Sequence, residues 1–207
     1  RESAFFLGLS FISFSLASAF GLFYLFFETY SKHITPRVSL KESLRSNAAE
    51  CLSFESAKAV ERALMFARRQ KTPQVNSTHL LYFLLEDNPD LGFVFARLNI
   101  DLKAVQKILL MSIKPSRGLP FSSPFWQQEE IIWTDDFLSV IESSILLTEK
   151  HKHQQVKHTD LLSALALHNE TLRNVLIQAD LRQEDIEHTV WWLENLERRL
   201  AIKRRFW

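Results

Sequence analysis

The chain has 207 residues, a formal net charge of +1 and a single cysteine, Cys51. This length allows one or two domains with a real hydrophobic core. The near-zero net charge gives no indication of nucleic-acid binding, and a lone cysteine excludes an internal disulfide framework. The thiol fits a reducing compartment, and we interpret it as an inert linker residue.

Residues 3–27 contain no charged side chain and are crowded with Phe, Leu, Ile, Ala and Ser. A bilayer core needs a helix of about 20 apolar residues, and Tyr24 lies towards the C-terminal end, where interfacial aromatic residues belong. A signal peptide is the alternative, because Ala17-Ser18-Ala19 resembles a cleavage site. The apolar run continues past that site, so we expect a transmembrane helix over residues 3–27.

The charges around this segment predict its orientation. Only Arg1 precedes it, whereas four basic residues follow it: Lys32, Arg37, Lys41 and Arg45. The positive-inside rule then places everything after Phe27 in the cytoplasm. We therefore expect a membrane protein that is single-pass within this chain. The polar residues 28–51 are expected to be a linker.

An internal repeat organises the rest of the chain. Residues 75–85 resemble residues 156–166 position by position, with Val75 aligned to Val156. We call this constant difference in residue number the repeat offset. Apolar residues with helical spacing match at the same offset without a gap. The further matching pairs are Ala57 with Leu138, Val60 with Ile141, Leu64 with Ile145, Val94 with Val175, Phe95 with Leu176 and Val105 with Ile186. The pattern predicts two copies of a four-helix unit.

At these residues the chain resembles the Clp N-terminal repeat domain, which lies at the front of Clp-type AAA+ unfoldases. Val75, Ser77, His79, Leu80 and Leu81 match the motif of the first repeat, and residues 99–102 resemble the turn into its fourth helix. The second copy departs from the motif. Asp160 replaces the His, Arg182 stands where the first copy has Asp101, and both copies have Thr (Thr78, Thr159) where the family commonly has Glu.

The resemblance implies an all-α domain over residues 52–190. We expect repeat one at 52–111, a linker at 112–130 and repeat two at 131–190. Phe121, Phe125 and Trp126 of the linker either dock on the domain, which we favour, or form part of a recognition surface.

The repeat motif supplies the candidate site residues, which we expect to hold the fold more than to contact a client. Ser77 and Thr78 are candidate helix caps. His79 has no potential metal ligand at suitable spacing, so we interpret it as a packed residue at a helix start. The full set is Val75, Ser77, Thr78, His79, Leu80, Leu81, Val156, Thr159, Asp160, Leu161 and Leu162.

Three histidines, His151, His153 and His158, lie close together in the second copy. Such a group indicates zinc binding or a pH-sensitive site. However, neighbouring lysines repel a cation, and the sequence shows no Cys or clear carboxylate beside the histidines. We therefore expect a solvated loop, no metal and no cofactor.

The tail, residues 191–207, is amphipathic and finally basic. It fits a helix on a membrane surface, a helix packed on the domain, or a connector to a downstream domain. The family resemblance favours the connector, because in that family ATPase modules would follow at about this point.

The chain lacks the motifs of an enzyme. Its four glycines, Gly8, Gly21, Gly92 and Gly118, form no phosphate-binding loop, and no nucleophile elbow or His-Glu-x-x-His motif is present. We expect recognition instead: the domain binds protein or peptide clients and adaptors through apolar side chains and passes them to an ATPase. A Clp peptidase would join through downstream ATPase modules, and membrane is a further expected partner. The alternatives are an accessory subunit without its own ATPase, and a membrane sensor or scaffold that uses the histidine loop.

Overall fold

The computed structural model describes residues 13–26, 48–70, 74–113 and 132–205. The chain divides into two compact units, Arg1–Thr35 and Pro36–Trp207. Most of the predicted linker at 28–51 and nearly all of that at 112–130, including its three aromatic residues, lie outside the described residues. Residues 48–51 are described and form a 3₁₀ helix, η1 (Ala48–Cys51), in which Cys51 is fully buried. Cys51 therefore belongs to the folded unit and not to a linker.

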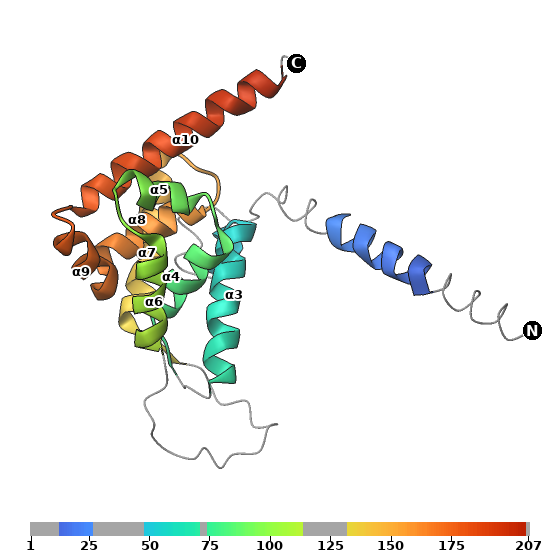
Figure 1. Ribbon diagram of the computed structural model, residues 1–207, viewed down its shortest axis with the longest axis horizontal. Helices are drawn as coiled ribbons and strands as arrows, with labels where there is room; N and C mark the ends of the chain where they lie inside the picture. The colour runs from blue at the N-terminus through green and yellow to red at the C-terminus, as the bar shows by residue number, and fades with distance from the viewer. Residues whose placement is uncertain (1–12, 27–47, 71–73, 114–131, 206–207) are drawn as a thin grey trace, which may run out of the picture. The chain divides into compact units, whose positions relative to one another are not determined.

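In the first unit, residues 13–26 form a helix with exposed side chains (Figure 1). No helix in the described part of the chain is long and apolar enough to cross a membrane. The predicted transmembrane helix over residues 3–27 is not supported, and the single-pass membrane location with a cytoplasmic repeat domain is wrong. The structure describes residues 13–26 of that segment, and residues 3–12 and 27 lie outside the described residues.

The second unit begins with η1 and continues through α3 (Phe54–Arg69), β1 (Gln74–Val75), α4 (Ser77–Asp87), α5 (Leu91–Arg97) and α6 (Leu102–Ile113). α3 shows why its boundaries fall where they do. The Ser53 hydroxyl accepts the backbone N–H of Ser56 at 3.3 Å and so caps the helix. Glu55 lies in the first turn and two arginines in the last, as the helix dipole favours.

The chain then continues through β2 (Ile132–Trp133), α7 (Asp135–His151), α8 (His158–His168), α9 (Glu170–Gln178) and α10 (Gln183–Arg205). The described residues are almost entirely helical, which confirms the all-α prediction. α10 is one continuous helix, so residues 191–205 of the predicted connector continue the helix that begins at Gln183. Figure 1 shows α10 extending beyond the other helices of this unit towards the C-terminus.

The repeat offset also relates backbone features of the two halves. It carries the start of α4 onto the start of α8, and the start of α6 onto the start of α10. Asn99, after α5, and Asp180, after α9, both adopt a left-handed conformation, with φ of 57° and 55°. A backbone hydrogen bond of 2.9 Å closes each of these turns, from Ile100 to Phe95 and from Leu181 to Leu176. The two helix ends therefore have the same geometry.

Short parallel pairings join the two halves reciprocally. Val75 in β1 pairs with Trp133 in β2, and Leu52 pairs with Val156 in an isolated parallel bridge. The repeat offset carries Leu52 onto Trp133 and Val75 onto Val156. The turn before the second helix of each half thus pairs with the segment before the first helix of the other half. This exchange is the pattern that a twofold axis between equivalent units produces.

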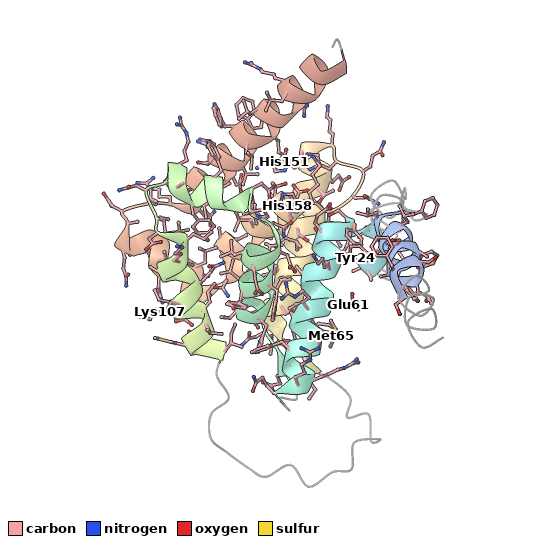
Figure 2. The ribbon with its side chains drawn as sticks, turned by 45° about the vertical axis from the view of Figure 1, so that its right-hand side comes forward. Tyr24, Glu61, Met65, Lys107, His151 and His158 are labelled. Carbon is pink, nitrogen blue, oxygen red and sulfur yellow. The ribbon has the colours of Figure 1, made fainter. Side chains whose placement is uncertain are left out.

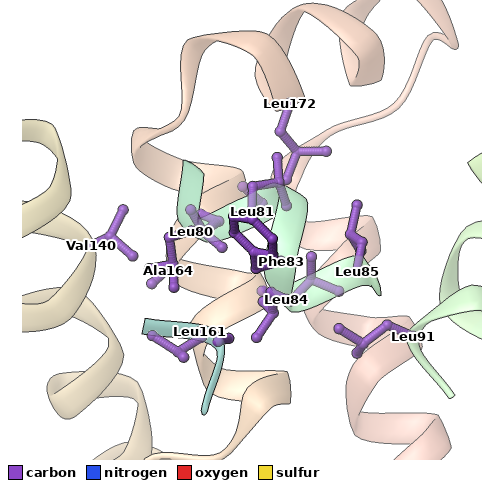
Figure 3. Packing of buried hydrophobic residues seen from close by; sticks show 14 of the residues in the cluster. Leu80, Leu81, Phe83, Leu84, Leu85, Leu91, Val140, Leu161, Ala164 and Leu172 are labelled. Carbon is purple, nitrogen blue, oxygen red and sulfur yellow. The ribbon is translucent and has the colours of Figure 1, made fainter. Parts of the chain in front are cut away.

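The core is built around α4 and α8, which are the most buried helices (Figure 3). α4 packs against α3, α6, α7 and α8, and α8 also contacts α7, α9 and α10. Helices that are apolar on most sides are typical of a protein interior. The fully buried leucines of these two helices are Leu80, Leu81, Leu84, Leu161, Leu162 and Leu165.

Candidate functional site

The repeat-motif residues lie at the starts of α4 and α8, and all but Thr78 are buried. The N-cap of α4 is Asn76, not Ser77 or Thr78 as predicted. Its side-chain oxygen accepts the backbone N–H of His79 at 3.1 Å, and the His79 ring lies at the reciprocal position of a capping box. Asp160 takes the position of His79 at the start of α8. Its Oδ2 accepts the backbone N–H of the N-cap residue, Lys157, at 3.2 Å. The His-to-Asp departure thus preserves the capping role.

Ser77 connects the two halves. Its backbone N–H donates to Asp136 Oδ2 at 3.0 Å, and its hydroxyl donates to the same oxygen. The buried Asn169 amide donates to the Ser77 hydroxyl at 2.8 Å and to Thr78 Oγ1 at 3.2 Å. Burial lowers the pKa of His79 despite the nearby Asp136 carboxylate, so the His79 ring is neutral at ordinary pH. This network is suited to holding two helix starts in place.

The Asp136 carboxylate predicts a pH dependence of stability. Burial opposes its ionisation, but hydrogen bonds from Ser77 and Thr134 outweigh burial and lower the pKa of Asp136 below 3.8. A lowered carboxylate pKa adds stability above the unfolded-state pKa, and that stability disappears as the pH falls through the folded-state pKa. We expect Asp136→Asn to lower the free energy of unfolding by about 1 kcal/mol near neutral pH, since solvent screens this half-buried group. Urea unfolding should show that wild type and Asp136→Asn differ less in free energy of unfolding well below pH 3.8. A difference between the two proteins that stays constant with pH would contradict this account.

The histidine loop is not solvated as predicted, because it packs around the fully buried Asp160. Asp160 Oδ1 lies 2.8 Å from His151 Nδ1, and Oδ2 lies 2.8 Å from His153 Nδ1. The other nitrogen of His153, Nε2, lies 3.1 Å from Glu194 Oε2 in α10. The His153 side chain is only 8% exposed. The carboxylate that the sequence did not place beside these histidines is therefore supplied by the first turn of α8.

His158 has a different partner. Its Nε2 lies 2.6 Å from Asp90 Oδ2, just before α5. Burial raises the pKa of Asp90, but the His158 hydrogen bond and charge outweigh burial and lower it overall. Figure 2 shows His151 and His158 at the same end of the helical unit. The structure therefore brings His151 and His153 together on one carboxylate, whereas His158 pairs with Asp90.

An aromatic pocket lies beside the histidine cluster, between the end of α7 and α10. Its volume is about 660 Å³, and its lining residues are Lys150, His151, Glu187, His188, Trp191 and Trp192. The Trp192 ring stacks on Phe93 of α5 with a centroid distance of 5.5 Å and an interplanar angle of 12°. The Arg97 guanidinium lies 5.1 Å from the Trp192 ring centroid. Trp191 is 64% exposed, so the pocket presents one fixed and one accessible indole.

A second, smaller hollow of about 270 Å³ lies between α3 and α4. Arg62 occupies its edge, where its guanidinium pairs with Glu86 at 2.9 Å and with Asp87, and lies 4.9 Å from the Phe83 ring centroid. The Arg62 guanidinium is therefore already engaged by two carboxylates and an aromatic ring. The aromatic pocket, with its accessible indole, is the better candidate for binding a partner.

Comparison with solved structures finds N-terminal domains of Clp-type ATPases. The N-terminal domain (1–163) of the ClpV1 ATPase from the E. coli EAEC Sci1 T6SS aligns with a TM-score of 0.57 and 18% identity, over 75% of this chain and 92% of that chain. The Hsp104 N-terminal domain from Candida albicans aligns with a TM-score of 0.55 and 18% identity, over 67% and 88%. A ClpV N-domain in complex with a VipB peptide aligns with a TM-score of 0.53 and 17% identity, over 74% and 91%. The chain has the fold of a Clp N-terminal domain.

The Clp N-terminal fold confirms the resemblance that the motif indicated. No protein-family model and no curated protein matches the sequence, so the likeness rests on structure. In this fold the motif residues surround the starts of the two central helices.

Sequence reasoning missed several residues of the site in this Clp N-terminal fold. Asn76 was overlooked because two other capping residues follow it directly. Asn88 and Asn169 are both buried, and the repeat offset carries one onto the other, so the repeat register offered a signal for them. Glu194 had no such signal, because only the fold brings it to His153.

Proposed function

We propose that this chain is the substrate- or adaptor-recognition domain of a Clp-type AAA+ ATPase and that it binds a peptide segment of a partner protein. The observation that carries the proposal is the fold, shared with N-terminal domains of ClpV and Hsp104 ATPases. One of these similar structures is a ClpV N-domain in complex with a VipB peptide. Protein recognition also agrees with a chain that carries no phosphate-binding loop.

We further propose that residues 52–111 and 131–190 are two copies of one four-helix unit. The reciprocal pairings of Val75 with Trp133 and of Leu52 with Val156 support this origin. The buried motif residues then serve to join the copies, and the client-binding surface lies elsewhere.

The aromatic pocket is the surface that we assign to the peptide. Tryptophan is enriched among the residues that dominate binding energy at interfaces. Phe93 and Arg97 hold the Trp192 ring in place, which reduces the entropy lost on binding. Lys150 and Glu187, which pair at 3.2 Å, provide polar groups at the rim. A mainly apolar hollow with a few polar groups suits an apolar side chain of an incoming peptide.

Energy for unfolding must come from an ATPase module, either in the same polypeptide or in a separate subunit on which this chain docks as an accessory. A Gly-rich Lys-Ser/Thr loop encoded beyond Trp207 supports the first arrangement, and a stop codon there supports the second. A Clp peptidase would be engaged through those ATPase modules and not through this domain. In both arrangements the role of this chain is to deliver a bound partner to the ATPase.

A peptide-library selection on the purified chain tests the recognition function. We expect enrichment of one related class of linear peptides that contain an aromatic or large aliphatic residue. Trp191→Ala is expected to weaken binding of a selected peptide by about tenfold or more, because tryptophan is enriched among the interface residues whose truncation costs about 2 kcal/mol or more. Fluorescence anisotropy of the labelled peptide gives the affinity.

Leu138→Ala is the matched control, because Leu138 is an exposed apolar residue of α7 that does not line the pocket. It should leave the affinity unchanged. Selection of no related peptides contradicts peptide recognition. Equal losses in the Trp191 and Leu138 variants contradict the assignment of the pocket alone.

A further inference from the structure

We propose that His151, His153 and Asp160 form a binding site for a divalent transition-metal ion, with Zn²⁺ as the best-matched ion. One imidazole nitrogen from each histidine and one carboxylate oxygen all lie within 4.8 Å of one another. His151 also lines the aromatic pocket, but the metal site does not rest on the peptide-binding function proposed above.

The donor set and its spacing suit zinc. Zinc binds imidazole nitrogen at about 2.0–2.1 Å and carboxylate oxygen at about 2.0–2.2 Å, with tetrahedral geometry. Donor atoms around such an ion lie about 3.3 Å apart. His151 Nδ1 and His153 Nδ1 face Asp160 at 2.8 Å each, so small side-chain shifts would admit the ion between them. Water would occupy the fourth position.

The groups around the donors have the arrangement that metal sites require. A ligating histidine usually donates its other N–H to a carboxylate, which fixes the ring. His153 Nε2 lies 3.1 Å from Glu194 Oε2, and Glu194 Oε1 accepts the Thr159 hydroxyl at 2.7 Å. Asp160 is oriented independently by the Thr148 hydroxyl at 3.1 Å and the Lys157 backbone N–H. Groups outside the cluster thus position Asp160 and His153, and His151 is held by its bond to Asp160.

The charge balance favours a cation. Asp160 is fully buried, and a buried carboxylate requires a compensating positive charge. In the described part of the chain, the ion-pair partners of Asp160 are His151 and His153, with no lysine or arginine side chain among them. Lys150 and Lys157, which a cation would be expected to avoid, are paired with Glu187 at 3.2 Å and Glu194 at 3.7 Å. Lys152, between the two histidines, is exposed to solvent, which screens its charge, so the repulsion that the sequence suggested is reduced.

The first half of the domain shows that the fold does not need this cluster. At the repeat offset, the positions of His151, His153 and Asp160 hold Gln70, Thr72 and His79. His79 still completes the capping box at the start of α4. A capping box therefore forms without any histidine at the positions of Gln70 and Thr72. The imidazoles of His151 and His153 around Asp160 are additional to what the cap requires.

Isothermal titration of ZnCl₂ into the full chain tests the site, after removal of any purification tag and treatment with a chelator. We expect one saturable equivalent of Zn²⁺ and a rise in the unfolding temperature on saturation, because the metal binds the folded state. His151→Ala and His153→Ala should each abolish the saturable binding. Glu194→Gln should weaken it by about 10–100-fold, as is typical for loss of an outer hydrogen-bonding partner. The visible absorption of Co²⁺ in place of Zn²⁺ should indicate tetrahedral coordination.

His188→Ala is the matched control, because His188 is exposed and lines the same aromatic pocket as His151 but is not one of the three proposed ligands. It should leave zinc binding unchanged. Absence of saturable binding by the wild-type chain, or an equal loss in the His188 variant, overturns the proposal. Circular dichroism checks that each variant is folded. If a histidine variant does not fold, the Zn²⁺ affinity of the Glu194→Gln variant tests the proposal instead. A Zn²⁺ affinity equal to that of the wild type then overturns the proposal.

Discussion

Replacing Leu161 by alanine is expected to lower the free energy of unfolding by about 2–5 kcal/mol, the usual range for a buried leucine that leaves a cavity. Leu161 is fully buried in the first turn of α8. α8 packs against α4, α7, α9 and α10, so its neighbours are held on several sides and can collapse only partly into the space. Urea unfolding, followed by tryptophan fluorescence and by circular dichroism, measures the change.

Leu138→Ala again serves as the control. Leu138 is 46% exposed on α7, and substitutions at such surface positions usually change stability by about 0.5 kcal/mol or less. Similar losses for the two leucines would contradict the placement of α8 at the centre of the core.

Removal of the Asp160 carboxylate is expected to destabilise the metal-free protein by several kcal/mol, since each buried group left without a hydrogen-bond partner costs about 1–3 kcal/mol. Asp160→Ala removes the acceptor of the Lys157 backbone N–H and the longer of two bonds from the Thr148 hydroxyl, which also donates to the Ser144 carbonyl at 2.7 Å. It also removes the partner of His151 and His153. Unsatisfied buried groups account for the large effect. Denaturant unfolding in the presence of a chelator provides the measurement.

Asp160→Asn should cause a smaller loss, because its remaining carbonyl oxygen can still accept the Lys157 backbone N–H. Glu142→Ala, at an exposed position of α7, controls for the loss of a surface carboxylate and should have little effect. If Asp160→Ala were no more destabilising than Glu142→Ala, the cluster would not be part of the folded core.

The sequence predicted those features that local periodicity and repetition specify. The spacing of Leu80, Leu81 and Leu84 indicated a buried helix, and the repeat offset correctly placed its counterpart at Leu161. The all-α prediction followed from the same pattern. The cap of α3 is a feature of the same local kind, because Ser53 bonds to the backbone of Ser56 only three residues away.

Contacts between distant segments could not be predicted in this way. Glu194 meets His153 only because α10 folds back over α8, and no pattern within the loop indicates this. The lysines near the histidines suggested that the histidine loop is exposed to solvent. Asp160 was predicted to belong to the repeat motif at the start of a helix, and its carboxylate was not connected with the histidines. The apolar run at residues 3–27 suggested a membrane span from composition, but the helix described there covers only residues 13–26.

The central claim is that this domain recognises protein partners through the aromatic pocket. The most direct measurement places a photo-crosslinking amino acid at Trp191, and separately at Leu138, in the intact gene product in its own cells. Mass spectrometry then identifies the crosslinked segments. We predict that position 191 captures peptide segments of clients or adaptors of a Clp-type ATPase and that position 138 does not. Recovery of the same proteins from both positions, or of no protein segment at position 191, would contradict the claim.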